Sequence, residues 1–209
     1  MAEEPPATVR QRQAAETKQH LLNAAVDVFE ERGYQATSVG AITQRAATAH
    51  GTFYLYFKNK EDAFCQVMET VIPELSPPAA LPPDLEFRDG IEHVIRAFIV
   101  AYRPRVGMWR AVLEGMLQSE RVRELWLDLR RTLVHGIAAV VESECKRGLV
   151  RPVDPLMTAH ALAAMTDWFA FMHFGLQEPP VVGTDQEPDD EQAIGVLVDL
   201  WLHSLYGQV

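Results

Sequence analysis

The segment 50-HGTFYLYFKNK-60 combines several side chains that could do chemistry with another molecule. Within eleven positions it places four aromatic rings, a histidine, a threonine, a glycine and two lysines. Hydroxyl, imidazole and ammonium groups bind phosphates and the polar edges of bases, whereas rings four residues apart suit the buried face of a helix. Phe53 and Phe57 have that spacing, so we predict that they face inward. Whether the other groups touch a partner depends on the elements around them.

Sequence patterns of catalysis are missing from the rest of the chain. The sequence contains no G-x-S-x-G, no phosphate-binding Walker loop and no H-E-x-x-H. Cys65 and Cys145 are too far apart to form a metal or redox motif, and we expect reduced thiols. His160 and Asp167 could share one helix face, but an ordinary surface histidine explains this spacing as well. We predict no catalytic site, no metal and no cofactor, and hence no enzyme.

The charge of the chain is divided unevenly between its two parts. The net charge is −10, yet residues 10–60 hold seven Lys and Arg against four Asp and Glu. This small excess of positive charge indicates that only the N-terminal part could bind a polyanion such as DNA. The most apolar run, 193-AIGVLVDLWL-202, is interrupted by Asp199, and the N-terminus is polar and acidic. We therefore expect a cytoplasmic protein without a membrane segment.

Helical spacing recurs along the chain, and strand signals are nearly absent, which predicts an all-α fold. Capping residues mark several boundaries: Ser38, Asn59 and Asp154 at helix starts, and Gly33 and Gly148 at helix ends. The predicted helices, about nine in number, cover 17–33, 39–46, 50–57, a segment from 59, 86–103, 106–117, 120–147, 154–174 and 189–206.

Three segments follow from this pattern. Residues 1–16 are predicted to be a flexible N-terminal arm, residues 17–62 a helix-turn-helix domain, and residues 63–209 a larger helical domain for ligand binding and dimerisation. The stretch 73–83 contains five prolines, which is incompatible with regular helix, and we predict that it connects the two domains. Arg10, Arg12 and Lys18 could form a basic arm or an uncommitted tail, and both possibilities stay open.

The N-terminal helices resemble the DNA-binding domain of the TetR family of bacterial regulators. A helix, a short helix, a four-residue turn and another short helix have the order of a helix-turn-helix motif. The segments that carry the resemblance are 29-FEERGYQATSV-39 and 51-GTFYLYFKNKEDAF-64, together with Ile42. In such a motif the second helix enters the major groove of DNA, and small residues at its start permit close approach.

The resemblance implies a DNA-binding role for a set of residues in this segment. Thr52 and Tyr54 would lie on the DNA face, Lys60 and Ser38 would reach phosphates from helix N-termini, and His50 and Thr52 could read base edges. Tyr56 is open between the edge of the core and the DNA backbone. The complete predicted set is Ser38, His50, Gly51, Thr52, Tyr54, Tyr56, Lys58 and Lys60.

The turn of the motif departs from the family pattern. The family commonly has A-G-V-S/T where this chain has 46-AATA-49. Ala47 replaces the glycine of a left-handed turn, and Ala49 replaces the capping Ser or Thr, which typically costs about 1 kcal/mol. Thr48 could move by one position and cap instead. The base contacts therefore do not follow from the resemblance.

The C-terminal part is rich in aromatic residues, and the helix at 160–174 is apolar nearly all round. Such a helix must be buried on two sides, so we predict a homodimer in which the last two helices of each chain form a four-helix bundle. This part resembles the EthR-type branch of the family, through 123-RELW-126, 142-ESECKRG-148, 165-MTDWFAFMHFG-175 and 198-VDLWLHSLYG-207. The resemblance implies an apolar effector tunnel, for which we predict the lining residues Phe98, Trp109, Trp126, Thr166, Phe171 and Trp201.

These patterns together predict a ligand-responsive transcription regulator. We expect a repressor that binds a palindromic double-stranded DNA operator and is released by a small, largely apolar effector. An apolar-ligand carrier without DNA function is the alternative, and an enzyme on a helical scaffold is a third possibility.

Overall fold

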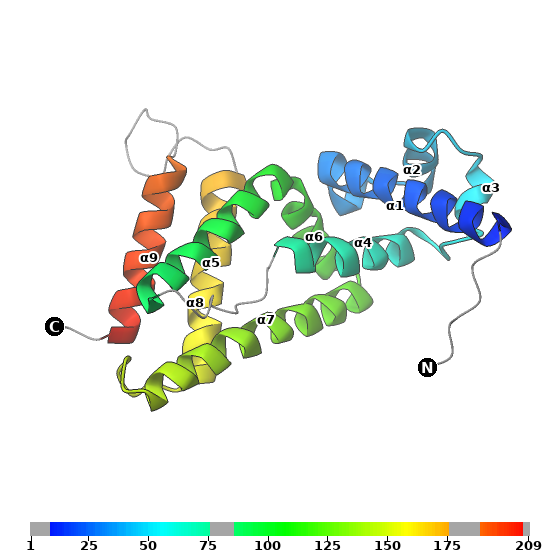
Figure 1. The fold of residues 1–209 in the computed structure, drawn as a ribbon. Coiled ribbons are helices and arrows are strands. Elements are labelled where there is room, and N and C mark those ends of the chain that lie inside the picture. The colour runs from blue at the N-terminus through cyan, green and yellow to red at the C-terminus, as the bar shows by residue number, and fades with distance from the viewer. Residues whose placement is uncertain (1–8, 76–85, 176–188, 207–209) are drawn as a thin grey trace, which may run out of the picture.

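The computed structural model describes residues 9–75, 86–175 and 189–206, and within these ranges every regular element is a helix. The prediction of an all-α fold is therefore confirmed. Helices α1 to α3 form one end of an elongated molecule, α8 and α9 lie at the other end, and α4 reaches from the first part towards the second (Figure 1).

The N-terminal end consists of α1 (Val9–Ala36), α2 (Val39–Arg45), α3 (His50–Phe53) and the start of α4 (Lys60–Leu75). Its core is aromatic. The ring centroids of Phe29 and Phe64 lie 4.5 Å apart, and those of Phe53 and Phe57 lie 5.0 Å apart. Phe53 and Phe57 are buried, as predicted. Full burial of one such side chain stabilises the fold by about 2 kcal/mol.

The larger end consists of five α-helices with two short helical turns between them. They are α5 (Phe87–Tyr102), the turn Arg103–Arg105, α6 (Val106–Gln118), α7 (Glu120–Lys146), α8 (Pro155–Ala170), the π-helical turn Phe171–Gly175 and α9 (Asp190–Tyr206). Helix α5 packs against α9, α7 packs against α8, and α6 packs against both α1 and α7. Helix α6 therefore touches both ends of the molecule.

The predicted caps at the helix starts are present. The side chain of Ser38 accepts a hydrogen bond from the N–H of Ala41, Asn59 accepts one from Asp62, and Asp154 accepts one from Met157. These bonds satisfy N–H groups that have no partner inside the helix.

The helix end predicted at Gly148 is confirmed, whereas the one predicted at Gly33 is an interruption, after which α1 continues to Ala36. Gly148 has φ of 73° just after α7, as a helix-ending glycine does. Gly33 has φ of 77° with an extended ψ of 177°, so it bends α1 and is not a left-handed cap.

Three boundaries differ from the sequence prediction. Residues 9–16, assigned to a flexible arm, form the first turns of α1, because the Arg, Gln, Ala and Glu in this stretch all favour helix. Helix α3 ends at Phe53 and is followed by a turn, so it is shorter than the predicted 50–57. Pro73 lies inside α4, two residues before its end. The helix tolerates a proline at this place, because the proline removes a single backbone hydrogen bond there. The rest of the predicted connection, from 76 onward, lies outside the described residues.

Candidate functional site

The turn between α2 and α3 is left-handed at an alanine. Ala47 has φ of 48°, and the N–H of Thr48 donates to the carbonyl of Thr43 at 3.0 Å. Ala49 occupies the N-cap of α3 without any side-chain hydrogen bond. The suggested shift of the cap to Thr48 does not occur, because its Oγ1 is buried without a partner among the described residues. The turn is thus left-handed at Ala47 and lacks a side-chain cap at Ala49.

A histidine that sequence reasoning missed supports this turn. The Nε2 of His20, on α1, lies 2.9 Å from the carbonyl oxygen of Ala46. Arg45, also missed, forms ion pairs with Asp27 and Glu31 of α1. These contacts fix α2 and the turn on α1. The separations of 26, 18 and 14 residues explain why no local pattern announced them.

The outer face of α3 is open. His50 and Tyr54 are exposed, and their ring centroids lie 5.4 Å apart. A Cβ added to Gly51 would meet no atom within 4 Å, so nothing in the chain itself requires glycine there. Thr52 is half-buried, and so is Tyr56, which packs against the core. The structure therefore brings His50, Gly51 and Tyr54 together on one accessible surface.

The two lysines beside α3 are placed differently. Lys58 is exposed, whereas the Nζ of Lys60 donates to the carbonyl of Tyr34 at 2.9 Å and lies 4.5 Å from the centre of the Tyr34 ring. Burial lowers the pKa of Lys60, and the carboxylate of Glu114 partly opposes this shift. Lys60 thus joins the start of α4 to the end of α1. Ser38 caps α2 and remains exposed, and its hydroxyl can still donate its proton, since no acceptor for it is found in the described parts of the chain.

Polar contacts connect this end of the molecule to α6. The guanidinium of Arg110 donates to the carbonyls of Glu30 and Glu31, and Arg105 pairs with the Glu30 carboxylate at 2.9 Å. A Cβ on Gly107 would approach the Glu30 carbonyl to 2.2 Å, so glycine permits the close packing of α6 on α1.

A second connection joins α4 to the start of α7. Arg121 donates to the carboxylate of Asp62 at 2.9 Å, and the hydroxyl of Ser119 donates to Glu61 at 2.7 Å. Asp62 also accepts the N–H of Lys58 at 3.0 Å. Burial pushes the pKa of Asp62 up, but the Lys58 N–H and the Arg121 guanidinium outweigh it and hold this pKa below its ordinary value.

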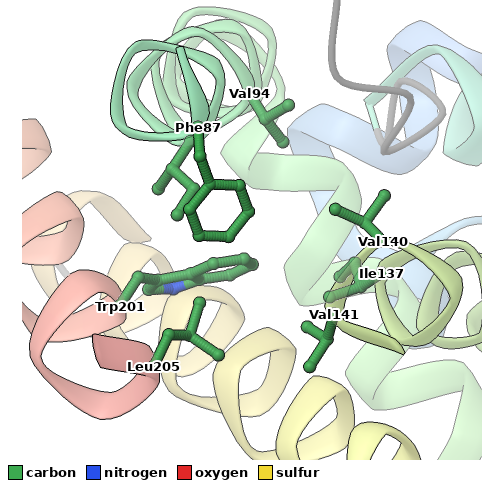
Figure 2. A pocket seen from close by; sticks show the side chains of 8 residues that line it. Phe87, Val94, Ile137, Val140, Val141, Trp201 and Leu205 are labelled. Atoms are coloured by element: carbon green, nitrogen blue, oxygen red, sulfur yellow. The ribbon is translucent and has the colours of Figure 1, made fainter. Parts of the chain in front are cut away.

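Two adjoining cavities, each partly open to the surface, lie in the larger end. The first, which we call the Phe87 cavity, spans about 350 Å³ when the space at its mouth that is open to solvent is included (Figure 2). The second, the Asp167 cavity, spans about 410 Å³ including its solvent-open mouth. The two share Val94, Ile137 and Trp201 as wall residues, so they lie side by side. Mostly apolar walls with a few polar groups are typical of small-molecule sites.

Half of the predicted lining residues lie on these walls. Phe98, Thr166 and Trp201 line the Asp167 cavity, and Trp201 also lines the Phe87 cavity. The rings of Trp109 and Trp126 pack edge to face at 5.2 Å in a neighbouring cluster that continues from Phe98 through Tyr102. Phe171 packs on Trp168. These last three predicted residues do not line either cavity.

The Asp167 cavity carries a few polar groups on its wall. Asp167 pairs with Arg130, and their side chains are only 18% and 14% exposed. Burial raises the pKa of Asp167, and the positive charge of Arg130 opposes the shift. Thr166 accepts a hydrogen bond of 3.0 Å from the indole Nε1 of Trp201.

Large apolar side chains are exposed along α8 and α9 and the turn after α8. Trp168 is 58% exposed and Met157 is 68% exposed, which is unusual for side chains of this size. The other members of this surface are Leu156, Met172, Val196 and Leu200. We call these six residues the α8–α9 surface.

The described parts of the chain contain neither a metal-binding cluster nor a membrane-spanning helix. No group of three or more His, Cys, Asp or Glu there could hold a metal ion, and His160 is simply exposed. None of the helices there combines the length and apolarity that crossing a membrane requires.

Family models match both ends of the chain. Residues 21–65 match the model described as bacterial regulatory proteins of the tetR family, and residues 91–207 match the C-terminal domain of the transcriptional regulator EthR. The two matches follow the division into helix-turn-helix end and larger end.

Relatives match over nearly the whole chain. The regulator YhgD of Bacillus subtilis is 26% identical, covering 88% of this chain and 94% of its own. EthR of Mycobacterium tuberculosis is 25% identical, covering 90% of this chain and 86% of its own. Among solved structures, a TetR family transcriptional regulator from Pseudomonas syringae has a TM-score of 0.69 at 20% identity, covering 97% and 100%. Salmonella enterica GusR has a TM-score of 0.72 at 18% identity, covering 91% and 95%. The solved structures share the fold.

Proposed function

The chain belongs to the TetR family of bacterial transcriptional regulators, with a C-terminal domain of the EthR type, and from this premise we propose a homodimeric repressor. In this proposal a small, largely apolar effector releases the dimer from a palindromic operator. As a member of this family, the protein is a regulator of transcription and not an enzyme. A regulator acts where the chromosome is, so we propose a cytoplasmic location.

The observation that carries the proposal is the open surface at the start of α3. His50 and Tyr54 are exposed beside Gly51, which has free space where a side chain would begin. A recognition helix needs such a face, because its first residues must approach the base edges closely. Thr52 lies at the edge of this surface, and Ser38, Tyr56, Lys58 and Lys60 are the proposed phosphate or backbone contacts around it.

The α8–α9 surface supports the proposed dimer. Its exposed apolar side chains would be covered if the same surface of a second chain packed against it, giving a four-helix bundle with a two-fold axis. A two-fold axis also suits DNA, since two recognition helices then meet half-sites about 34 Å apart. The palindromic operator follows from this symmetry.

The two cavities support the proposal that an effector binds. The contacts of α6 support the proposal that this effector changes DNA binding. Trp109 on α6 belongs to the aromatic cluster that continues from the cavity wall, while Gly107 and Arg110 of the same helix hold α1. An effector that prefers a different position of α6 would shift the dimer towards a form with misplaced recognition helices. The effector can weaken operator binding only as far as it binds the form with misplaced recognition helices more tightly than the DNA-binding form.

The test is binding to DNA. Purified protein freed of bound ligand should shift the intergenic DNA upstream of its own gene at moderate salt, and binding should weaken steeply as salt rises. A regulator without preference for that DNA over unrelated DNA would contradict the proposal. The alternative, an apolar-ligand carrier without DNA function, predicts ligand binding with no DNA shift at any salt concentration.

Gly51→Ala sharpens this test. The new methyl group meets nothing in the chain, and helical Ala is favoured over Gly, so stability should rise by about 0.5 kcal/mol. Operator affinity should nevertheless fall about tenfold, because the methyl group intrudes on the DNA. Gly148→Ala, far from α3 in sequence and also with open space around it, is the control and should leave DNA binding unchanged. Equal operator affinity of Gly51→Ala and the unaltered protein would remove α3 from the interface.

A further inference from the structure

The walls of the Asp167 cavity contain few polar groups, and their hydrogen bonds can be counted. Thr166, Asp167 and Trp201 are the polar members, and the remaining wall residues are aliphatic or aromatic. In an apolar cavity, a small number of polar groups fixes which ligand is accepted. The chemistry of this ligand therefore depends on which of the three groups has unused capacity.

No hydrogen-bond donor is left on these wall side chains. The indole N–H of Trp201 donates to the hydroxyl of Thr166 at 3.0 Å. The Thr166 hydroxyl has a single proton, which it donates to the carbonyl of Leu162 at 2.9 Å. A ligand that only accepts hydrogen bonds, such as a carboxylate, an ester or an ether, would find no free donor on these side chains.

An acceptor is left, and it is the carboxylate of Asp167. Its Oδ2 accepts from Nη1 of Arg130. Its Oδ1 has no donor among the residues that the structure describes, and the side chain lines the cavity. A carboxylate oxygen accepts more than one hydrogen bond, so Asp167 can take a donor from a ligand.

The charge of the pair selects against ions. Arg130 already neutralises Asp167, and both side chains are mostly buried. A carboxylate ligand would bring a second negative charge to Asp167, and an ammonium ligand would bury a positive charge that no further anion on the cavity wall balances. A neutral donor pays neither electrostatic cost.

Resting on the proposed function, we infer that the effector is a neutral amphiphile with one hydrogen-bond donor, a hydroxyl or an amide N–H, directed at Asp167. Its apolar chain extends past Trp201 into the Phe87 cavity. Figure 2 shows that cavity, with Phe87 and Trp201 facing Val140 and Val141 across it. The walls there are entirely carbon apart from the Trp201 nitrogen, which is already bonded to Thr166.

Two isomers test the inference on the unaltered full-length protein. 1-Nonanol and octyl methyl ether have the same atoms, but only the alcohol has a donor. Calorimetric titration should give an affinity about tenfold higher for 1-nonanol, as expected for a hydrogen bond to a charged acceptor. Nonanoate and nonylammonium should both bind more weakly than 1-nonanol. Equal affinities of the two isomers, or tightest binding by nonanoate or nonylammonium, would overturn the inference.

A double variant locates the effect at the ion pair. Asp167→Leu together with Arg130→Met removes both charges at once, since removing one alone would leave the other buried and unpaired. In this variant the ratio of the two affinities should fall to about one, with thermal melting by circular dichroism as the check of folding. Ile95→Val is the matched control: it changes the same wall without touching the pair and should keep the ratio. A preference for 1-nonanol that survives in the folded double variant would also overturn the inference.

The outcomes separate this inference from the proposed function. A wrong order of affinities defeats the inference alone, because the cavity then still binds apolar molecules. Failure of all four probes to bind the unaltered protein would defeat the inference and the effector part of the proposed function. Operator binding is measured without ligand, so its failure would defeat the repressor itself.

Discussion

The carboxylate of Glu114 lies where a side chain at position 33 would begin. A Cβ on Gly33 would approach Oε2 of Glu114 to 2.5 Å, and the same oxygen accepts the N–H of Gln35 at 2.9 Å. Gly33 also has φ of 77° and ψ of 177°, a conformation that only glycine adopts readily. The end of α1 therefore meets α6 at Gly33, where backbone geometry and close packing both require glycine.

We expect Gly33→Ala to lower the free energy of unfolding by about 3 kcal/mol, which combines backbone strain with the displacement of Glu114. Gly148→Ala is the control, because Gly148 has a similar φ of 73° but nothing within 4 Å of an added Cβ. It should cost about 1 kcal/mol. Urea denaturation of both variants measures the difference, and equal losses would show that the contact with Glu114 contributes nothing.

We expect Ala47→Gly to stabilise the protein by about 0.5 to 1 kcal/mol. Ala47 has φ of 48°, where the Cβ of alanine is strained, and the relief exceeds the entropy cost of a more flexible unfolded chain. Its neighbour Ala46, with φ of −77°, gives the control, since Ala46→Gly removes a buried methyl group without relieving strain and should destabilise. A loss of stability in Ala47→Gly, measured by thermal unfolding, would contradict the strained turn.

We expect Lys58→Ala and Lys60→Ala to differ in stability but to agree in salt dependence. Lys58 is exposed, so its loss should change stability by less than about 0.5 kcal/mol. Lys60→Ala should cost about 1 kcal/mol, because its bond to the Tyr34 carbonyl and its contact with the Tyr34 ring are lost. If both contact phosphates, each variant should reduce the salt slope of operator binding by about one. An unchanged slope in Lys60→Ala would leave that residue with the structural contact alone.

We expect Asp62 to stabilise the protein at neutral pH and to lose this effect in acid. Its folded pKa is lowered, so its contribution is complete above the unfolded pKa of about 3.9 and disappears as the pH falls through the lower folded value. Asp62→Asn should cost about 1 to 2 kcal/mol at pH 7, because charge-assisted bonds to Arg121 and Lys58 weaken.

Urea titrations at several pH values check this prediction for Asp62. The difference in unfolding free energy between the unaltered protein and Asp62→Asn should shrink as the pH falls from 5 towards 2. A difference that stays constant over this range would show that the charge of Asp62 does not support the connection between α4 and α7.

The sequence by itself determined the helices, several of their ends and the family. The caps at Ser38, Asn59 and Asp154 and the glycine at 148 act within a few residues of the chain, so they are readable as local patterns. The burial of Phe53 and Phe57 followed from their spacing for the same reason.

The tertiary structure alone decided which side chains meet across the chain. The contact of Lys60 with Tyr34 and that of Glu114 with Gln35 join residues 26 and 79 positions apart. Density of aromatic residues suggested a cavity but could not separate Trp201, on its wall, from Trp109, in the neighbouring cluster. The ion pair of Asp167 with Arg130 is likewise a product of tertiary structure, because it forms only when α7 and α8 pack together. Local propensity acts over a few residues, whereas a binding site is built from contacts that packing creates.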